Sequence, residues 1–162
     1  MKEVRPTSGR VLLALFSILG PMEGKHFLDL FAGTGRVGLS ALERGAGSVA
    51  WVESVRARAQ AIERALPQNG TETLVLSLEL RRAVSWLLKR ERAFDVLFAD
   101  PPYHEGWGAE LLNVKGLDTL VSPNGVLVVE HSIREDLALP PPWALRDQRD
   151  YGETRLTFVE AR

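Results

Sequence analysis

The four residues Asp100-Pro101-Pro102-Tyr103 carry groups that suit the binding of an amino group on a planar ring. They follow residues 94–99, a short apolar run that predicts a buried strand. The acid and a backbone carbonyl can accept hydrogen bonds from an exocyclic amine, and the two prolines restrict φ and remove N–H donors. The tyrosine offers a face for stacking. A proline-stiffened turn after a strand has the same composition, so this segment needs support from the rest of the chain.

Residues 33–38 form a second candidate site, with the glycine spacing G-x-G-x-x-G. Such glycines allow a tight turn and a close approach by a ligand, although a turn that needs glycine only for its backbone angles is the alternative. Glu53 ends the next predicted strand, where a carboxylate can accept hydrogen bonds from both hydroxyls of a ribose. Asp29 would repel a pyrophosphate, but it would attract the sulfonium and amino groups of S-adenosylmethionine. The loop therefore favours S-adenosylmethionine over a nicotinamide dinucleotide.

The apolar pattern predicts alternating strands and helices that position these residues. Strands are expected over residues 26–31, 48–53, 73–78, 94–99 and 126–131. Helices are expected over residues 11–19, 37–45, 56–66, 82–92 and 108–121, and a hairpin over 144–149 and 154–160. The fold class is thus α/β, a doubly wound, mostly parallel seven-stranded sheet with a C-terminal antiparallel hairpin. Ligands of such sheets bind beyond the carboxyl ends of the strands, where Asp29, Glu53 and Asp100 would meet.

The composition suits one globular domain, because 162 residues with 45% hydrophobic content can form one core. We expect residues 1–162 to be one domain with a short helical segment at about 5–20. The net charge of −1 gives no overall sign of nucleic acid binding. There is no cysteine, and His26, His104 and His131 are scattered, so we expect no metal site. No apolar run approaches ~18 residues and the start lacks a signal peptide, so we expect a cytoplasmic protein.

Three segments together resemble class I S-adenosylmethionine-dependent methyltransferases that act on amino groups. They are Asp29-Leu-Phe-Ala-Gly-Thr-Gly35, Glu53 and Asp100-Pro-Pro-Tyr103. The opening segment Arg5-Pro-Thr-Ser-Gly-Arg10 and the run Gly38-Leu-Ser-Ala-Leu-Glu-Arg-Gly45 narrow the resemblance. With them, the chain resembles the bacterial small-subunit (16S) ribosomal RNA guanine-N2 methyltransferases. The resemblance extends from Arg5 through Tyr103 and more weakly to the terminal hairpin.

The resemblance implies methyl transfer from S-adenosylmethionine to guanine N2 in ribosomal RNA or the small-subunit particle. Separately, we expect a monomer. The residues that it implies in catalysis are Asp100, Pro101, Pro102 and Tyr103. Those implied in cofactor binding are Asp29, Phe31, Ala32, Gly33, Thr34, Gly35, Gly38 and Glu53. Those implied in RNA binding are Arg5, Arg10, Arg36 and His104.

Two departures from the family pattern leave alternatives open. The family usually opens with a basic β-hairpin before the Arg-Pro-Thr segment, and only Met1 to Val4 precede Arg5. The acid or amide that usually faces the adenine corresponds to Arg82, and Glu79 is the nearest acid. An adenine-N6 methyltransferase, a protein-glutamine methyltransferase and an inactive nucleotide- or RNA-binding module remain as alternatives. A nicotinamide oxidoreductase is disfavoured by Asp29 and by the size of the chain.

Overall fold

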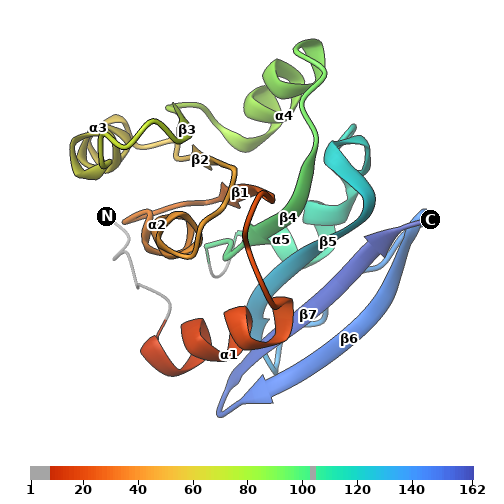
Figure 1. The fold of residues 1–162 in the computed structure, drawn as a ribbon. Helices are drawn as coiled ribbons and strands as arrows, with labels where there is room; N and C mark the ends of the chain where they lie inside the picture. The colour runs from red at the N-terminus through yellow and green to blue at the C-terminus, as the bar shows by residue number, and fades with distance from the viewer. Residues whose placement is uncertain (1–7, 103–104) are drawn as a thin grey trace.

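The computed structural model describes residues 8–102 and 105–162 (Figure 1). The strands are β1 (His26–Leu30), β2 (Ser48–Val52), β3 (Glu72–Leu76), β4 (Phe94–Ala99), β5 (Val121–Ser132), β6 (Trp143–Tyr151) and β7 (Thr154–Ala161). The helices are α1 (Gly9–Leu19), α2 (Arg36–Glu43), α3 (Arg56–Ala65), α4 (Leu80–Lys89) and α5 (Trp107–Glu110). Two 3₁₀ helices, η1 (Leu111–Asn113) and η2 (Asp118–Leu120), follow α5.

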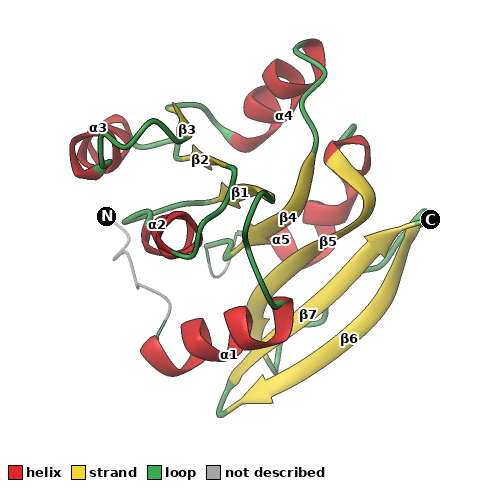
Figure 2. Cartoon of the chain, viewed as in Figure 1, coloured by secondary structure: helices red, strands yellow, loops and turns green. Residues whose placement is uncertain are grey.

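Within the described ranges, seven strands form one sheet in the order β3-β2-β1-β4-β5-β7-β6 (Figure 2). The first five strands along the chain run parallel, and β7 and β6 add an antiparallel hairpin beyond β5. The predicted fold class is therefore confirmed. β1 and β4 are direct neighbours, so the loops that leave their carboxyl ends start side by side. These loops contain the two segments that the sequence singles out.

Apolar side chains fill both sides of the sheet, as expected of parallel strands covered by helices. Successive residues of one strand enter different layers: Phe27 packs in the layer with α1, α2 and Ile62 of α3. Leu28 packs in the opposite layer, with α4, η1 and η2. Trp51 of β2 is fully buried in the first layer, behind residues 33–38, the glycine loop. The loop therefore rests on a large and fully buried side chain.

One predicted helix is wrong. The apolar spacing of residues 108–121 predicts a single helix, but the chain forms α5 and two 3₁₀ helices there. Gly116 between η1 and η2 has φ +87°, and a Cβ on it would lie 2.3 Å from Cδ1 of Leu88. A helix cannot pass through this left-handed residue, and its close contact with α4 favours the broken path.

The fifth strand begins earlier than predicted. β5 starts at Val121 rather than Val126, and the pairing of β5 with β4 shifts register between Phe94 and Val96. Ser122 Oγ lies 2.9 Å from both the carbonyl oxygen of Phe94 and Oδ1 of Asp95, so its one hydrogen is shared between them. Asn124 has φ +67°, a conformation that asparagine tolerates better than most residues. Residues 122–125 are thus an irregular part of the strand.

Within the described part of the chain, no helix is both long and apolar enough to span a membrane.

Candidate active site

Two acids hold the glycine loop through backbone hydrogen bonds. Asp29, in β1, is 2% exposed, and its Oδ2 accepts a hydrogen bond from the N–H of Gly38 at 2.9 Å. Glu53, directly after β2, accepts from the N–H of Gly33 through Oε1 and from the N–H of Val55 through Oε2, both at 2.8 Å. A carboxylate oxygen has more than one acceptor site, so Glu53 can bind both the loop and ribose hydroxyls.

The glycines of this loop are required by close packing. A Cβ on Gly38 would lie 2.3 Å from Nε1 and 2.7 Å from Cε2 of Trp51. Gly35 has φ +80°, and a Cβ there would lie 2.8 Å from Cγ1 of Ile62. Nε1 of Trp51 donates to the carbonyl of Gly35 at 3.0 Å. The start of α2 is therefore pressed against Trp51, with no room for side chains at either position.

Phe31 connects the glycine loop to the segment after β4. It has φ +53°, which is unusual for a bulky residue and indicates local strain. Its ring makes an edge-to-face contact with Trp107, with centroids 5.0 Å apart and planes at 68°. The guanidinium carbon of Arg81 lies 5.0 Å from the centroid of Trp107, on the other side of this junction. Trp107 is the first residue of α5, so it anchors that helix to the loop.

Asp100 follows β4 directly, and its surroundings favour the neutral carboxyl. Burial raises the pKa of Asp100 to about 8, and repulsion from Glu130 and then from Asp29 adds to the effect. Glu130 in β5 is 8% exposed. Its position follows from strand register, because Ala99 pairs with Val129 and the next residues are Asp100 and Glu130.

The sequence reasoning missed Glu130, although a signal was available. Glu130 lies near the carboxyl end of a predicted strand, which is the criterion that selects Asp29, Glu53 and Asp100. Burial also raises the pKa of Asp29 to about 8. The hydrogen bond from Gly38 lowers this pKa, and repulsion from Glu53 raises it further. The edge of the sheet therefore gathers four acids, which suits a ligand with positive charge.

Two of the four predicted RNA contacts, Arg10 and Arg36, lie within the described residues. The guanidinium carbon of exposed Arg10 lies 5.8 Å from the ring centroid of Tyr151, where α1 lies beside the β6–β7 hairpin (Figure 1). Nη2 of Arg36 lies 3.7 Å from the position of a Cβ on Gly9, so the first turns of α1 and α2 adjoin. Arg10 and Arg36 are thus brought to the same region. Arg5, Tyr103 and His104 lie outside the described residues.

Glu79 and Arg82 occupy the start of α4, where the resemblance drawn from the sequence implies an adenine contact. Glu79 is the N-cap: its side chain accepts a hydrogen bond from the N–H of Arg82 at 3.4 Å. It also forms an ion pair with Arg81 at 3.6 Å, and Arg81 pairs with Glu110 of α5 at 3.3 Å. The nearby acid therefore caps the helix and pairs with Arg81.

The strand order, with an antiparallel hairpin added to five parallel strands, is that of the class I S-adenosylmethionine-dependent methyltransferases. The acids around the glycine loop suit the positive charges of that cofactor. The model of the family described as conserved hypothetical protein 95 matches residues 1–160. The chain belongs to this family, which confirms the family-level resemblance drawn from the sequence.

Relatives and solved structures agree with this assignment. The ribosomal RNA small subunit methyltransferase D of Escherichia coli (strain K12) is 30% identical over 93% of this chain and 76% of its own. The structure of the putative methyltransferase yhhF from Escherichia coli matches with a TM-score of 0.83 and 26% identity, over 98% of this chain and 89% of that one. The Thermus thermophilus 16S rRNA N2 G1207 methyltransferase (RsmC), in complex with AdoMet and guanosine, has a TM-score of 0.71 and 25% identity. That match covers 99% of this chain and 44% of the other.

Proposed function

We propose that this protein transfers a methyl group from S-adenosylmethionine to the exocyclic N2 amine of a guanine in small-subunit ribosomal RNA. The observation that carries the proposal is Asp100 with its two prolines, placed directly after β4 and beside the strand that leads into the glycine loop. We further propose that residues 1–162 are one methyltransferase domain, acting as a monomer, with residues about 5–20 as its N-terminal helical segment.

The proposed cofactor site is built from the loop after β1 and the end of β2. Glu53 would accept hydrogen bonds from the ribose, and Asp29 would attract the positive charge of the cofactor. The residues assigned to the cofactor are Asp29, Phe31, Ala32, Gly33, Thr34, Gly35, Gly38 and Glu53. S-adenosylmethionine supplies the electrophilic methyl group, so the protein mainly has to orient the acceptor.

The proposed acceptor site uses Asp100 and the carbonyl of Pro101, with Pro102 fixing the backbone and Tyr103 stacking on the base. The lone pair of guanine N2 is delocalised into the ring, so it is a weak nucleophile. Hydrogen bonds from N2 to Asp100 and Pro101 would direct that lone pair at the methyl carbon. The sulfur–methyl bond breaks as the nitrogen–methyl bond forms, and the sulfonium becomes a neutral thioether. The proton that N2 then loses passes to the Asp100 carboxylate.

Two relatives support guanine N2 and ribosomal RNA as the acceptor. One is named a small-subunit ribosomal RNA methyltransferase, and RsmC, whose fold covers nearly all of this chain, holds guanosine and AdoMet. The exposed arginines Arg10 and Arg36 fit phosphates next to a base drawn out of its helix or loop, and Arg5 and His104 complete the proposed RNA contacts.

A deletion strain provides the direct test. Mass spectrometry and primer extension on its ribosomal RNA should show the loss of one N2-methylguanine, and the purified protein should restore it on small subunits from that strain. Loss of an N6-methyladenine, or of a methylated glutamine in a protein, would instead assign the same loop to another acceptor. An unchanged methylation pattern, with no transfer in vitro, would favour an inactive binding module.

Cofactor binding should release protons at neutral pH. The pKa of Asp29 and of Asp100 is raised to about 8 in the free protein, so both carboxyls are largely protonated at pH 7. S-adenosylmethionine has a net positive charge, which favours ionised carboxylates and lowers both pKa values, so binding below pH 8 expels protons. Calorimetry at pH 7 in buffers of different ionisation enthalpy should detect about one released proton or more.

The pH and the ligand provide the controls for this measurement. At pH 9.5 both groups are already ionised, so the release should vanish. S-adenosylhomocysteine lacks the sulfonium charge and should release fewer protons at pH 7. A binding enthalpy that does not depend on the buffer at pH 7 would contradict the raised pKa values.

Removing the predicted phosphate contacts should weaken RNA binding without affecting cofactor binding. Arg10→Ala combined with Arg36→Ala should raise KM for small-subunit RNA about tenfold at low salt and flatten the salt dependence of binding, because two phosphate contacts are lost. Filter binding between 50 and 200 mM salt measures this effect. Arg146→Ala, which removes a hairpin arginine paired with Glu160, should leave KM unchanged. An equal loss in both variants would refute a specific role for Arg10 and Arg36.

A further inference from the structure

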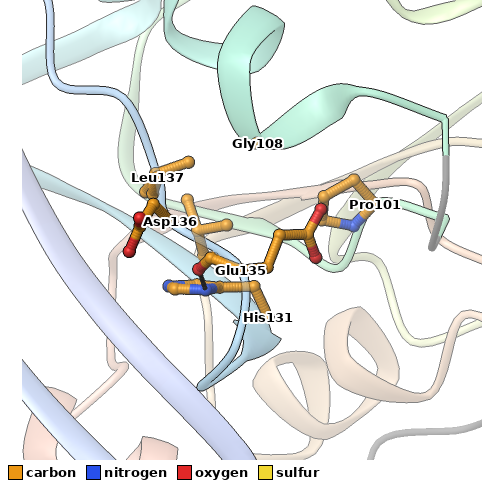
Figure 3. A pocket seen from close by; sticks show the side chains of 7 residues that line it. Pro101, Gly108, His131, Glu135, Asp136 and Leu137 are labelled. Carbon is orange, nitrogen blue, oxygen red and sulfur yellow. Dashed lines mark hydrogen bonds between the residues drawn. The ribbon is translucent and has the colours of Figure 1, made fainter.

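A small pocket lies next to Pro101, outside the glycine loop (Figure 3). Pro101, Gly108, Val129, His131, Glu135 and Leu137 are among the residues that line it. In Figure 3 the side chain of Glu135 extends toward Pro101, and the carboxylate points away from the ring of His131. The pocket therefore places a second carboxylate beside the proposed acceptor site. The sequence reasoning did not select Glu135.

The backbone of Glu135 is held in place by β5 and β7. His131 Nδ1 lies 2.9 Å from the carbonyl of Glu135 and 3.0 Å from that of Ser132, so this nitrogen must be the donor. Its Nε2 lies 2.7 Å from Oγ1 of Thr157 in β7. The N–H of Glu135 donates to the carbonyl of Ser132 at 3.1 Å. A buried histidine thus fixes the turn that carries Glu135.

The start of α5 holds the same segment from the other side. Ala138 N–H donates to the carbonyl of Gly108 at 2.9 Å. A Cβ on Gly108 would lie 2.8 Å from the carbonyl oxygen of Asp136 and 3.4 Å from Oε1 of Glu135. The absence of a side chain at Gly108 therefore allows the Glu135 carboxylate to approach the loop after β4.

The carboxylate of Glu135 differs from five other acids in the second half of the chain. These five each contact an arginine: Glu110, Asp147, Asp150, Glu153 and Glu160. Among residues 8–102 and 105–162, the Glu135 carboxylate has no hydrogen bond or ion pair. A negative charge beside a site for a polyanion opposes binding, unless it meets a hydrogen-bond donor of the substrate. This carboxylate is half-buried, and the backbone that carries it is held by hydrogen bonds.

We propose that Glu135 accepts the N1–H of the target guanine and thereby selects guanine over other amino bases. The inference rests on the proposed function, because it assumes that Asp100 and Pro101 hold the N2 amine. In guanine the amine lies between two ring nitrogens, and one of them, N1, carries a hydrogen. In adenine and cytosine the ring nitrogen next to the amine carries a lone pair, which a carboxylate repels. In the pocket next to Pro101, the Glu135 carboxylate can distinguish a ring nitrogen that carries a hydrogen from one that carries a lone pair.

The site is expected to discriminate strongly between guanine and a base that lacks N1–H. A site built to hydrogen-bond a substrate N–H rejects an analogue that lacks it by up to ~10⁴-fold, because the buried partner is left unpaired. Glu135→Gln keeps an acceptor for N1–H and adds an amide donor that can meet a bare ring nitrogen. This substitution should therefore relax the preference with little change in shape.

The test uses 2-aminopurine in place of the target guanine, at the position mapped in the deletion strain. This base keeps the N2 amine but lacks both N1–H and O6. The loss of O6 affects wild type and variant alike, so a double-mutant cycle isolates the interaction between Glu135 and N1–H. Wild-type protein should methylate the guanine RNA at least ~100-fold faster than the 2-aminopurine RNA. In Glu135→Gln the ratio of kcat/KM for the guanine RNA to kcat/KM for the 2-aminopurine RNA should fall by tenfold or more. Glu153→Gln, the same change at an exposed glutamate paired with Arg134, should keep the wild-type ratio.

The outcomes separate the two proposals. If guanine N2 is methylated and the ratio is the same in Glu135→Gln and wild type, the role of Glu135 is overturned while the proposed function stands. If the wild-type protein modifies neither RNA at N2, the proposed function fails and the inference fails with it. S-adenosylhomocysteine binding and thermal unfolding of Glu135→Gln should match wild type, since a structural defect would change both.

Discussion

Asp100→Ala is expected to lower the single-turnover rate of methyl transfer by about 10³-fold or more, because it removes both the orientation of the amine and the proton acceptor. The dissociation constant of S-adenosylhomocysteine should change by less than about threefold, since the cofactor is held mainly by the loop after β1. Single turnover with labelled cofactor and small subunits measures the rate, and calorimetry measures the binding. Near-wild-type transfer in this variant would eliminate the proposed role of Asp100.

Two further variants show which property of Asp100 matters. Asp100→Asn keeps the shape and one acceptor oxygen but cannot take the proton, so its rate should lie between those of wild type and Asp100→Ala. Asp95 in the same strand accepts hydrogen bonds from His26 N–H and from Ser122 Oγ, far from the loops. Asp95→Ala should therefore lower the free energy of unfolding by about 1–3 kcal/mol, while the rate of methyl transfer by the folded protein stays unchanged.

Gly38→Ala should damage both the fold and the cofactor site. The new Cβ would lie 2.3 Å from Nε1 of the fully buried Trp51, so either the indole or α2 must move. The hydrogen bonds from Trp51 to Gly35 and from Gly38 to Asp29 would both be disturbed. We expect a loss of about 1–3 kcal/mol of unfolding free energy, or a Tm lower by about 3–10 °C. Affinity for S-adenosylhomocysteine should fall at least about tenfold.

Gly9→Ala is the matched control for this prediction. Gly9 is also at the start of a helix, but the nearest atom to its added Cβ is Nη2 of Arg36, at an ordinary contact distance of 3.7 Å. Its Tm and cofactor affinity should stay at wild-type values, as measured by thermal unfolding and calorimetry. If both alanines had the same small effect, the packing of Gly38 against Trp51 would not be limiting.

Sequence patterns located most elements because local signals and tertiary packing agree there. β4 has the predicted bounds, since its apolar run stops at Asp100 and Pro101 cannot donate to a sheet. The helix expected over residues 108–121 failed because its break at Gly116 depends on contact with Leu88, which is distant in the sequence. Local apolar spacing contains no information about such a contact.

The candidate site was predicted only in part for the same reason. Asp29, Glu53 and Asp100 could be selected because parallel strands bring their carboxyl ends to one edge. Glu135 could not, because its place beside Pro101 depends on a turn held by His131 and on the missing side chain of Gly108. The left-handed backbone of Phe31 also has no sequence signal, since bulky residues rarely adopt it.

The pairing of β1 with β4 has a consequence for how such enzymes can diversify. The loop proposed to bind the methyl donor leaves β1, and the loop proposed to bind the acceptor leaves its hydrogen-bonded neighbour β4. Backbone hydrogen bonds keep neighbouring strands about 4.8 Å apart whatever their side chains are. Under these assignments the distance between the two loops is set by the sheet, while the proposed selection of the acceptor lies in a separate segment, the turn of Glu135. Mutations can alter substrate preference in these segments without rebuilding the donor site, which allows one scaffold to give rise to enzymes for different amines.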